Sequence, residues 1–200
     1  MKVSLENIGK KFSKTWIFKG LSYEFLPGEK YAILGNNGSG KSSLIKIISG
    51  QSSPNTGRIS YENTEADEVY KKLSLCAPYM DLVEELNLEE LLLFVEQFKA
   101  FHKDYPVERI LNMFPFKKDK WIKDYSSGMK QRVKLALALF SDVDLCLLDE
   151  PSTNLDEEGM LWLQEQLEQL PAHKTLIIAS NLEREYSLCK HFIEISKYKN

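Results

Sequence analysis

The sequence predicts an α/β fold in which a helical segment interrupts a mostly parallel β-sheet. Three observations support this prediction. Residues 31–34, 143–148 and 175–178 form short apolar runs, which are typical of buried parallel strands. The amino-terminal residues alternate polar and apolar side chains as in half-buried strands, and we expect an antiparallel β portion there. Between residues 79 and 140, apolar side chains recur at helical spacing instead.

The composition fits one ordinary domain and excludes several classes of protein. The chain has 200 residues, of which 43% are hydrophobic, enough for a full core. Lys and Arg number 26 against 29 Asp and Glu, a formal charge of −3, so we expect no nucleic-acid partner. Three cysteines in apolar surroundings are too few for a disulfide scaffold. They predict buried free thiols in a reducing cytoplasm.

The first third of the chain predicts strands followed by one helix. Val3, Leu5 and Ile8 begin a half-buried strand pattern, and residues 17–26 continue it as a second strand. Beyond a Pro-Gly turn at 27–28, we expect a strand at 31–34, a helix at 41–49, and strands at 58–61 and 73–77.

The middle of the chain predicts helices, and strands resume after it. A helix is expected where Leu82, Leu86, Leu91, Leu92, Val95 and Phe98 recur at helical spacing between acidic residues. Two more are expected at 107–113, with Pro106 at its first turn, and after residue 128. Strands at 143–148, 175–178 and 191–195, with an amphipathic helix at 156–170, complete the fold. We therefore expect one domain over 1–200, with a core of about 1–78 and 142–200 and a helical subdomain of about 79–141.

A glycine-rich segment between a predicted strand and a predicted helix carries the first functional motif. It fits the pattern G-x-x-x-x-G-K-[ST] and comprises Gly35, Asn36, Asn37, Gly38, Ser39, Gly40, Lys41 and Ser42, with Ser43 following. Small residues let successive backbone N–H groups surround a polyphosphate at a helix N-terminus. Lys41 can reach the β- and γ-phosphates, and the Ser42 hydroxyl suits Mg²⁺. The alternative is a glycine-rich turn without a ligand.

An apolar strand ends in two carboxylates at Asp149 and Glu150. In a parallel α/β sheet, a buried strand delivers its last side chains to the edge where the phosphate loop lies. Asp149 is then suited to hold Mg²⁺, directly or through water. Glu150 can polarise a water for attack on the γ-phosphate as a general base.

The segment before this acidic strand resembles the signature sequence of the ATP-binding cassette (ABC) proteins, usually L-S-G-G-Q. Tyr125 replaces the leucine, whereas Ser126 and Gly128 keep their places; Ser127 and Met129 replace a glycine and the glutamine. The resemblance implies a P-loop, RecA-like core with an inserted α-helical subdomain. It also implies that residues Ser126, Ser127, Gly128 and Met129 close on the γ-phosphate bound by an opposite subunit.

Other segments match the same family. Residues 151–156 resemble its D-loop, so Asn154, Leu155 and Asp156 are expected at a dimer interface, and residues 53–57 resemble its P-x-x-G turn. Phe12 aligns with the aromatic residue that stacks on adenine, with Trp16 as the alternative.

Two positions depart from the family pattern. Tyr79 stands where the family has a glutamine that touches Mg²⁺ and the attacking water, and a neutral phenol is a poor ligand for this ion. Asn181 stands in place of a histidine that contacts the γ-phosphate, and an amide cannot carry charge or shuttle a proton. We therefore expect a slow ATPase. His102 and His173 are expected on the surface, and His191 lies too far along the chain to substitute.

The resemblance implies the ATP-binding subunit of an ABC transporter, which hydrolyses Mg-ATP in a head-to-tail dimer. The expected partners are a second ATP-binding subunit, identical or not, and an integral membrane subunit that holds the protein at the inner face of the membrane. The expected cofactors are ATP and Mg²⁺. One alternative is a non-transport ABC ATPase of repair, translation or assembly. Another is a P-loop kinase, which would not need a water-activating glutamate. The transported substrate cannot be inferred from these residues.

Overall fold

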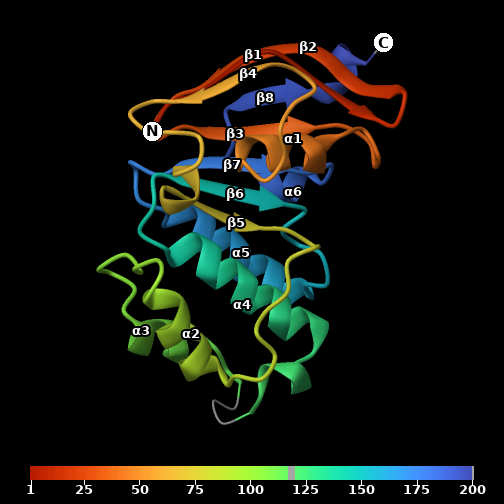
Figure 1. The fold of residues 1–200 in the computed structure, drawn as a ribbon. Coiled ribbons are helices and arrows are strands. Elements are labelled where there is room, and N and C mark those ends of the chain that lie inside the picture. Colours follow the sequence, from red (N-terminus) through yellow and green to blue (C-terminus); the bar gives the residue numbers. More distant parts are fainter. Residues whose placement is uncertain (117–119, 200) are drawn as a thin grey trace.

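Parallel strands form the centre of the computed structural model, which describes residues 1–116 and 120–199. The sheet has the order β5-β6-β7-β3-β8, and every paired neighbour is parallel (Figure 1). Its strands are β3 (Lys30–Leu34), β5 (Leu73–Cys76), β6 (Leu145–Asp149), β7 (Thr175–Ala179) and β8 (His191–Glu194). All residues of β6 and β7 are buried, which explains their continuous apolar sequence.

A second, antiparallel sheet is built from the amino-terminal residues. Its order is β2-β1-β4, formed by β1 (Val3–Phe12), β2 (Thr15–Phe25) and β4 (Thr56–Tyr61). Helix α1 (Lys41–Ile48) lies between this sheet and the parallel one (Figure 1). Buried side chains of both sheets and of α1 share one hydrophobic core. The predicted antiparallel portion is thereby confirmed.

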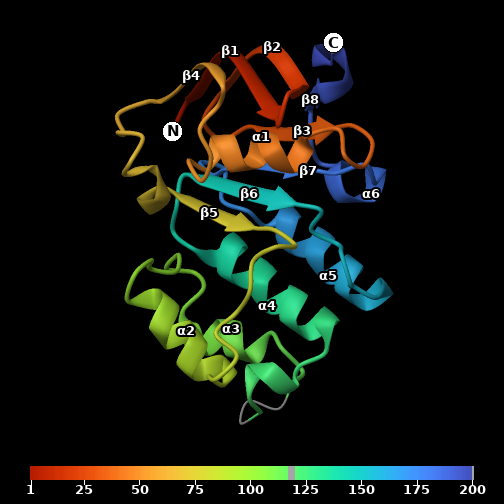
Figure 2. The same cartoon turned by 45° about the vertical axis from the view of Figure 1, so that its right-hand side comes forward.

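Helices α4 (Ser127–Phe140) and α5 (Glu157–Glu168) cover the opposite face of the parallel sheet. Helices α2 (Leu88–Glu96) and α3 (Val107–Asn112) pack beyond α4, away from the sheet (Figure 2). The shorter elements are α6 (Glu183–Tyr186) and the 3₁₀ turns Val69–Lys71, Ile122–Asp124 and Ile195–Tyr198. The predicted subdomain includes residues 117–119, which lie outside the described residues, and its boundaries stay a prediction.

Some expectations about the helical segment were wrong. The helix expected from Leu82 begins only at Leu88. Asn87 is the N-cap that fixes where the helix begins. Its side chain accepts a hydrogen bond from the Glu90 amide, and the Glu90 carboxylate accepts one from the Asn87 amide. Pro106 is the N-cap of α3, one position before the first turn. The predicted strands agree with the structure to within one or two residues.

The histidines and cysteines are only partly as expected. His102 is not a surface residue: its side chain is 14% exposed, and its amide donates to the carbonyl of Phe140 at 2.8 Å. His173 is exposed, as expected. All three cysteines are free and buried. Among the described residues, no helix combines the length and hydropathy that a membrane span requires.

Candidate nucleotide site

The phosphate loop joins the carboxyl end of β3 to the first turn of α1. Its tight course depends on Gly40, whose φ of 108° is left-handed. A Cβ at Gly40 would lie 2.5 Å from Cγ2 of Ile17, so a larger residue would push the antiparallel sheet away. The loop opens into a hollow of ≈ 380 Å³ that is lined by Ile17, Asn37, Gly38, Gly40, Lys41, Ser42, Ser43 and Glu150.

Lys41 is the buried cation of this loop. Its side chain is 3% exposed, and Nζ donates to the carbonyl of Gly35 at 2.8 Å. The same ammonium lies 3.9 Å from Oε1 of Glu150. The structure thus brings the predicted phosphate-binding lysine and the predicted general base together at one loop.

Asp149 ends β6 with a carboxylate that is buried but unsatisfied. The residue is 1% exposed, and neither carboxylate oxygen has a hydrogen-bond partner among the described residues; the same is true of the Ser39 hydroxyl. Burial raises the pKa of Asp149, although the nearby Ser42 hydroxyl and the Lys41 ammonium lower it in part. Buried polar atoms are normally bonded. A carboxylate with free oxygens suits Mg²⁺, and the neighbouring Ser42 hydroxyl offers a second oxygen, so Asp149 and Ser42 fit the ion.

Glu150 holds a strained backbone conformation. Its φ of 46° is left-handed, which is unfavourable for a residue with a Cβ and persists only when neighbours fix it. Its amide donates to the carbonyl of Ala179 at 2.9 Å, and its carbonyl accepts from the amide and the hydroxyl of Thr153. Its side chain is 40% exposed and can reach water.

Asn181 follows β7 and contacts the phosphate loop. Its Nδ2 donates to Oδ1 of Asn37 at 3.3 Å. Asn181, which stands in place of the family's histidine, therefore lies beside the phosphate loop that carries Lys41 and that Glu150 approaches. The order β6-β7-β3 in the sheet explains this, because neighbouring parallel strands end at one edge.

Tyr79 lies in a cluster that sequence reasoning missed. Its hydroxyl donates to Oε1 of Gln51 at 3.2 Å, and the Lys46 ammonium lies 3.9 Å from the centre of its ring. Burial and the nearby Asp149 carboxylate raise the pKa of Tyr79 to about 12. The phenol therefore stays neutral at physiological pH and engages an amide. Gln51 belongs to no sequence motif, so its contact with Tyr79 could not be predicted without the fold.

Phe12 and Trp16, the two candidates for stacking on adenine, both lie in the β1-β2 hairpin but differ in their surroundings. Trp16 pairs with Lys11 across the strands, and the ammonium groups of Lys11 and Lys19 lie 4.2 and 5.2 Å from its ring centre. Phe12 is 79% exposed, so it is not the core residue that an aromatic in an early strand usually is. This difference favours Phe12 over Trp16 as the stacking residue.

The signature residues surround a different hollow, of ≈ 360 Å³. It is lined by Pro115, Phe116, Ser126, Ser127, Gly128, Met129, Arg132, Asn154, Asp156 and Glu158, and it shares no lining residue with the phosphate-loop hollow. Ser126 caps α4 by accepting a hydrogen bond from the Met129 amide. A Cβ at Gly128 would lie 2.9 Å from the Asn154 carbonyl, so the glycine permits a close approach of two segments.

The predicted dimer loop is tied to the signature helix. Arg132 donates from Nη2 to Asp156 at 2.9 Å and from Nη1 to Glu158 at 3.1 Å. Asp156 also caps α5 by accepting from the Gly159 amide, and these contacts lower the pKa of its carboxyl. Leu155 packs on the core, whereas Asn154 adopts a left-handed φ of 65°.

A phosphate loop on an α/β core, with an acidic strand end beside it and a signature helix, defines a P-loop ATPase domain of the cassette type. The sequence model of the ABC transporter family matches residues 18–153, and the chain belongs to that family. It is an ATP-binding subunit of the ABC transporter type and an ATPase, which confirms the expected class and fold.

Named relatives agree with this assignment. The chain is 28% identical over 201 residues to the uncharacterised ABC transporter ATP-binding protein YybJ of Bacillus subtilis (strain 168), covering 97% of this chain and 92% of that protein. It is 28% identical to the Nod factor export ATP-binding protein I of Burkholderia orbicola (strain AU 1054), covering 98% of this chain and 68% of that protein.

Solved structures show the same fold. An ABC transporter ATP-binding protein from Pyrococcus furiosus superposes with a TM-score of 0.84 at 23% identity, over the whole of both chains. A dimeric ATP-binding cassette in a post-hydrolysis state, bound to ADP and Pi, gives a TM-score of 0.77 at 23% identity over 96% of this chain and 93% of that one.

Proposed function

We propose that this ATPase binds Mg-ATP in the phosphate-loop hollow and hydrolyses it there to drive transport through a separate membrane subunit. The observation that carries the proposal is the unsatisfied carboxylate of Asp149, buried beside Ser42 and close to Lys41 and Glu150. Such a group is costly unless a ligand completes it. ATP with a divalent cation is the ligand that this family binds.

Each residue has a role that follows from its position. The loop amides of residues 35–43 and the Lys41 ammonium bind the phosphates, and Phe12 stacks on the base. Ser42 and Asp149 would hold Mg²⁺, and the ion would supply positive charge against the phosphates when bound. Glu150 accepts the proton of the attacking water. Asn181 donates a hydrogen bond toward the γ-phosphate.

We also propose that two subunits, identical or not, complete the site head to tail. The signature hollow and the phosphate-loop hollow of one chain share no residue, which supports pairing each with the other hollow of a second chain. In this arrangement Ser126, Ser127, Gly128 and Met129 contact the γ-phosphate of the opposite subunit. Asn154, Leu155 and Asp156 then lie at the interface.

One experiment tests binding, hydrolysis and dimerisation together. The Glu150→Gln variant should bind ATP without cleaving it and should therefore sediment as a dimer when Mg-ATP is present. Adding Lys41→Ala removes a charge-assisted contact of about 1.5–3 kcal/mol, so the double variant should stay monomeric at the same ATP concentration. A monomeric Glu150→Gln variant at high protein and ATP concentrations would contradict a homodimer and leave pairing with a different subunit.

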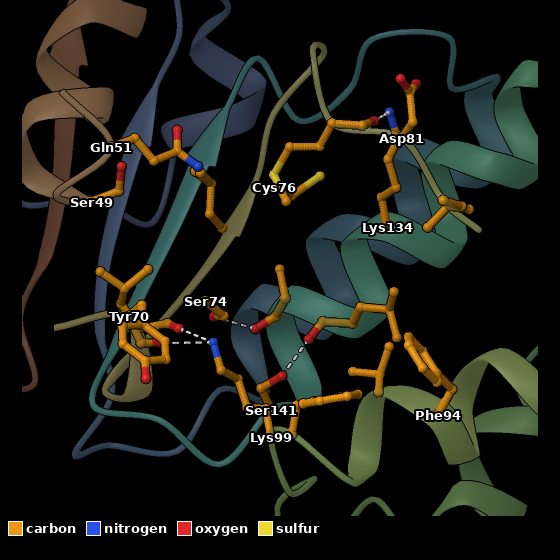
Figure 3. Close-up of a pocket in the computed structure, with 18 residues that line it drawn as sticks. Ser49, Gln51, Tyr70, Ser74, Cys76, Asp81, Phe94, Lys99, Lys134 and Ser141 are labelled. Atoms are coloured by element: carbon orange, nitrogen blue, oxygen red, sulfur yellow. Dashed lines mark hydrogen bonds between the residues drawn. The ribbon is translucent and has the colours of Figure 1, made fainter. Parts of the chain in front are cut away.

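A cleft beside β5 supports a membrane partner. It has a volume of ≈ 400 Å³ and lies between β5 and helices α2 and α4 (Figure 3). Phe94 of α2 and Phe98, two residues beyond the end of α2, line it and are 44% and 75% exposed. Lys99 and Lys134 donate to backbone carbonyls at its edges. An apolar cleft of this size suits a short segment of an integral membrane subunit. Binding there would hold the protein on the cytoplasmic face of the membrane.

A further inference from the structure

Glu185 is a buried acid that the proposed catalytic roles leave unexplained. It lies on the one-turn helix α6 and is 3% exposed. None of the ion pairs formed by the described residues includes it. A carboxylate buried without a cation costs free energy, so a purely structural position would be better filled by a neutral residue.

The two oxygens of Glu185 bind two different loops of the candidate site. Oε1 accepts a hydrogen bond from the amide of Ser152 at 2.8 Å. Oε2 accepts one from the hydroxyl of Ser180, which in turn accepts from the amide of Leu182 at 2.9 Å. Ser152 is two residues beyond Glu150, and Ser180 directly precedes Asn181.

The two loops need such a link. Glu150 is held in a left-handed conformation, which requires its surroundings to fix it. Ser180 is fully buried and anchors the start of the segment that carries Asn181 to the phosphate loop. A carboxylate can accept from both loops at once, whereas an amide offers only one acceptor oxygen.

We propose that Glu185 is a positioning residue, which sets the distance between the general base Glu150 and the γ-phosphate contact Asn181 by bridging Ser152 and Ser180. This inference rests on the proposed function, because it depends on the roles proposed for Glu150 and Asn181. It assigns no chemistry to Glu185 itself. Its hydrogen bonds in the described structure go to Ser152 and Ser180 and not to the phosphate loop. It should therefore affect turnover and leave ATP affinity unchanged.

The test compares kcat, KM and the dissociation constant for ATP in purified full-length variants. Glu185→Ala should lower kcat at least tenfold while KM and the dissociation constant stay within twofold of wild type. Glu185→Gln keeps one acceptor oxygen and should recover part of kcat, with an unfolding temperature at or above that of wild type because a buried charge is gone. Adding Ser180→Ala to Glu185→Ala should lower kcat no further, since both changes break one link.

The matched control is Glu183→Ala, which removes the same charge from an exposed position on the same helix and should keep wild-type kcat. An unchanged kcat in Glu185→Ala would overturn the proposal. So would a Glu185→Gln variant that is less stable and binds ATP more weakly in proportion to its loss of kcat. Glu150→Gln is measured in parallel: if it hydrolyses ATP like wild type, the proposed hydrolysis site fails as well. If Glu150→Gln is inactive and Glu185→Ala is unaffected, only the positioning role fails.

Discussion

Asp149 lies at the end of a fully buried strand, where its carboxylate has no hydrogen-bond partner among the described residues. In the absence of nucleotide this position lowers stability, because burial raises the pKa of the acid. The folded chain therefore binds a proton at Asp149 more tightly than the unfolded chain does. The contribution of this proton to the stability of the fold is fully present below pH 3.8, the pKa of an ordinary Asp. It is lost as the pH rises through the higher pKa of the folded state.

Asp149→Asn should accordingly stabilise the nucleotide-free protein at neutral pH. Each kcal/mol of relief would raise the unfolding temperature by about 2–4 °C for a domain of this size. The gain over wild type should shrink as the pH is lowered toward 3.8, where the wild-type acid is protonated. Thermal unfolding with chelator and then with Mg-ATP measures both effects, since the variant should lose stabilisation by Mg-ATP. A variant that is less stable than wild type without nucleotide would contradict this account of the site.

Asn181 and Tyr79 depart from the family pattern, and replacing them tests whether they slow hydrolysis. Restoring the family residues with Asn181→His and Tyr79→Gln should raise the steady-state rate of Mg-ATP hydrolysis. A missing transition-state donor costs about 10²–10³ in rate in other enzymes, and the amide of Asn181 supplies part of this, so we expect a gain of about tenfold. Tyr79→Phe is the control, because it removes the bond to Gln51 without adding an amide. An unchanged rate, or a wild type that already turns over at about 10 s⁻¹, would refute the idea of a slow ATPase.

Helix α4 connects the two halves of the candidate machinery. Its N-terminus carries the signature residues. Gln131, in its second turn, donates at 2.8 Å to the carbonyl of Pro151, the residue that follows Glu150. Its C-terminus ends in the protein interior, where the terminal carbonyls need donors. Ser74 donates to Ala138, and the buried ammonium of Lys174 donates to Leu139 and Ser141 at 2.7 and 2.6 Å.

Lys174→Met should therefore destabilise the protein. Methionine fills a similar volume but leaves the buried carbonyl of Leu139 without its donor, whereas the carbonyl of Ser141 keeps the amide of Val143. An unsatisfied buried group costs about 1–3 kcal/mol. We expect a loss of roughly 1–3 kcal/mol in the free energy of unfolding, measured by urea denaturation. The control is Lys190→Met, at an exposed position, which should change it little. A Lys174→Met variant of wild-type stability would mean that the charge costs as much as its hydrogen bonds contribute.

The elements that could be predicted are those whose residues carry the pattern locally. Strands β6 and β7 are buried on both faces, so each is a continuous apolar run, and the phosphate loop is a contiguous motif. The start of α2 was missed because the spacing of Leu82 and Leu86 imitates a helix, whereas the capping box at Asn87 decides the boundary. Gln51, Glu185 and Lys174 were not foreseen, because each has a partner 28 to 35 residues away, and only the strand order brings them together.

The whole molecule places its cleft and its phosphate loop on neighbouring parts of one chain. Tyr79 contacts Gln51 and Lys46 at one end of the segment that continues into the cleft residues Met80 and Asp81. A subunit docked in the cleft would therefore sit next to the nucleotide site. This arrangement fits a protein whose hydrolysis drives a separate membrane component.

Loss of the apolar cleft rim should separate docking from hydrolysis. Phe98→Ser removes an aromatic side chain that is 75% exposed at the cleft, just beyond α2, and should leave the ATPase rate of the purified subunit unchanged. In cells that make the membrane subunit, the same variant should move from the membrane fraction to the supernatant, because an aromatic anchor at an interface contributes about 2 kcal/mol or more. Leu161→Ser, on the exposed face of α5, is the matched control. A Phe98→Ser variant that stays with the membranes would argue against this cleft as the docking site.

The separation of the two hollows has a consequence for inheritance. If each hollow works with its counterpart on another chain, an allele that damages only the signature residues spoils the nucleotide site of its healthy neighbour and leaves its own phosphate loop intact. An allele that damages only Lys41 does the reverse. In a cell that carries both alleles, each mixed pair would contain one site with both defects and one site with none, so two individually defective genes would together restore one of the two sites in every mixed pair.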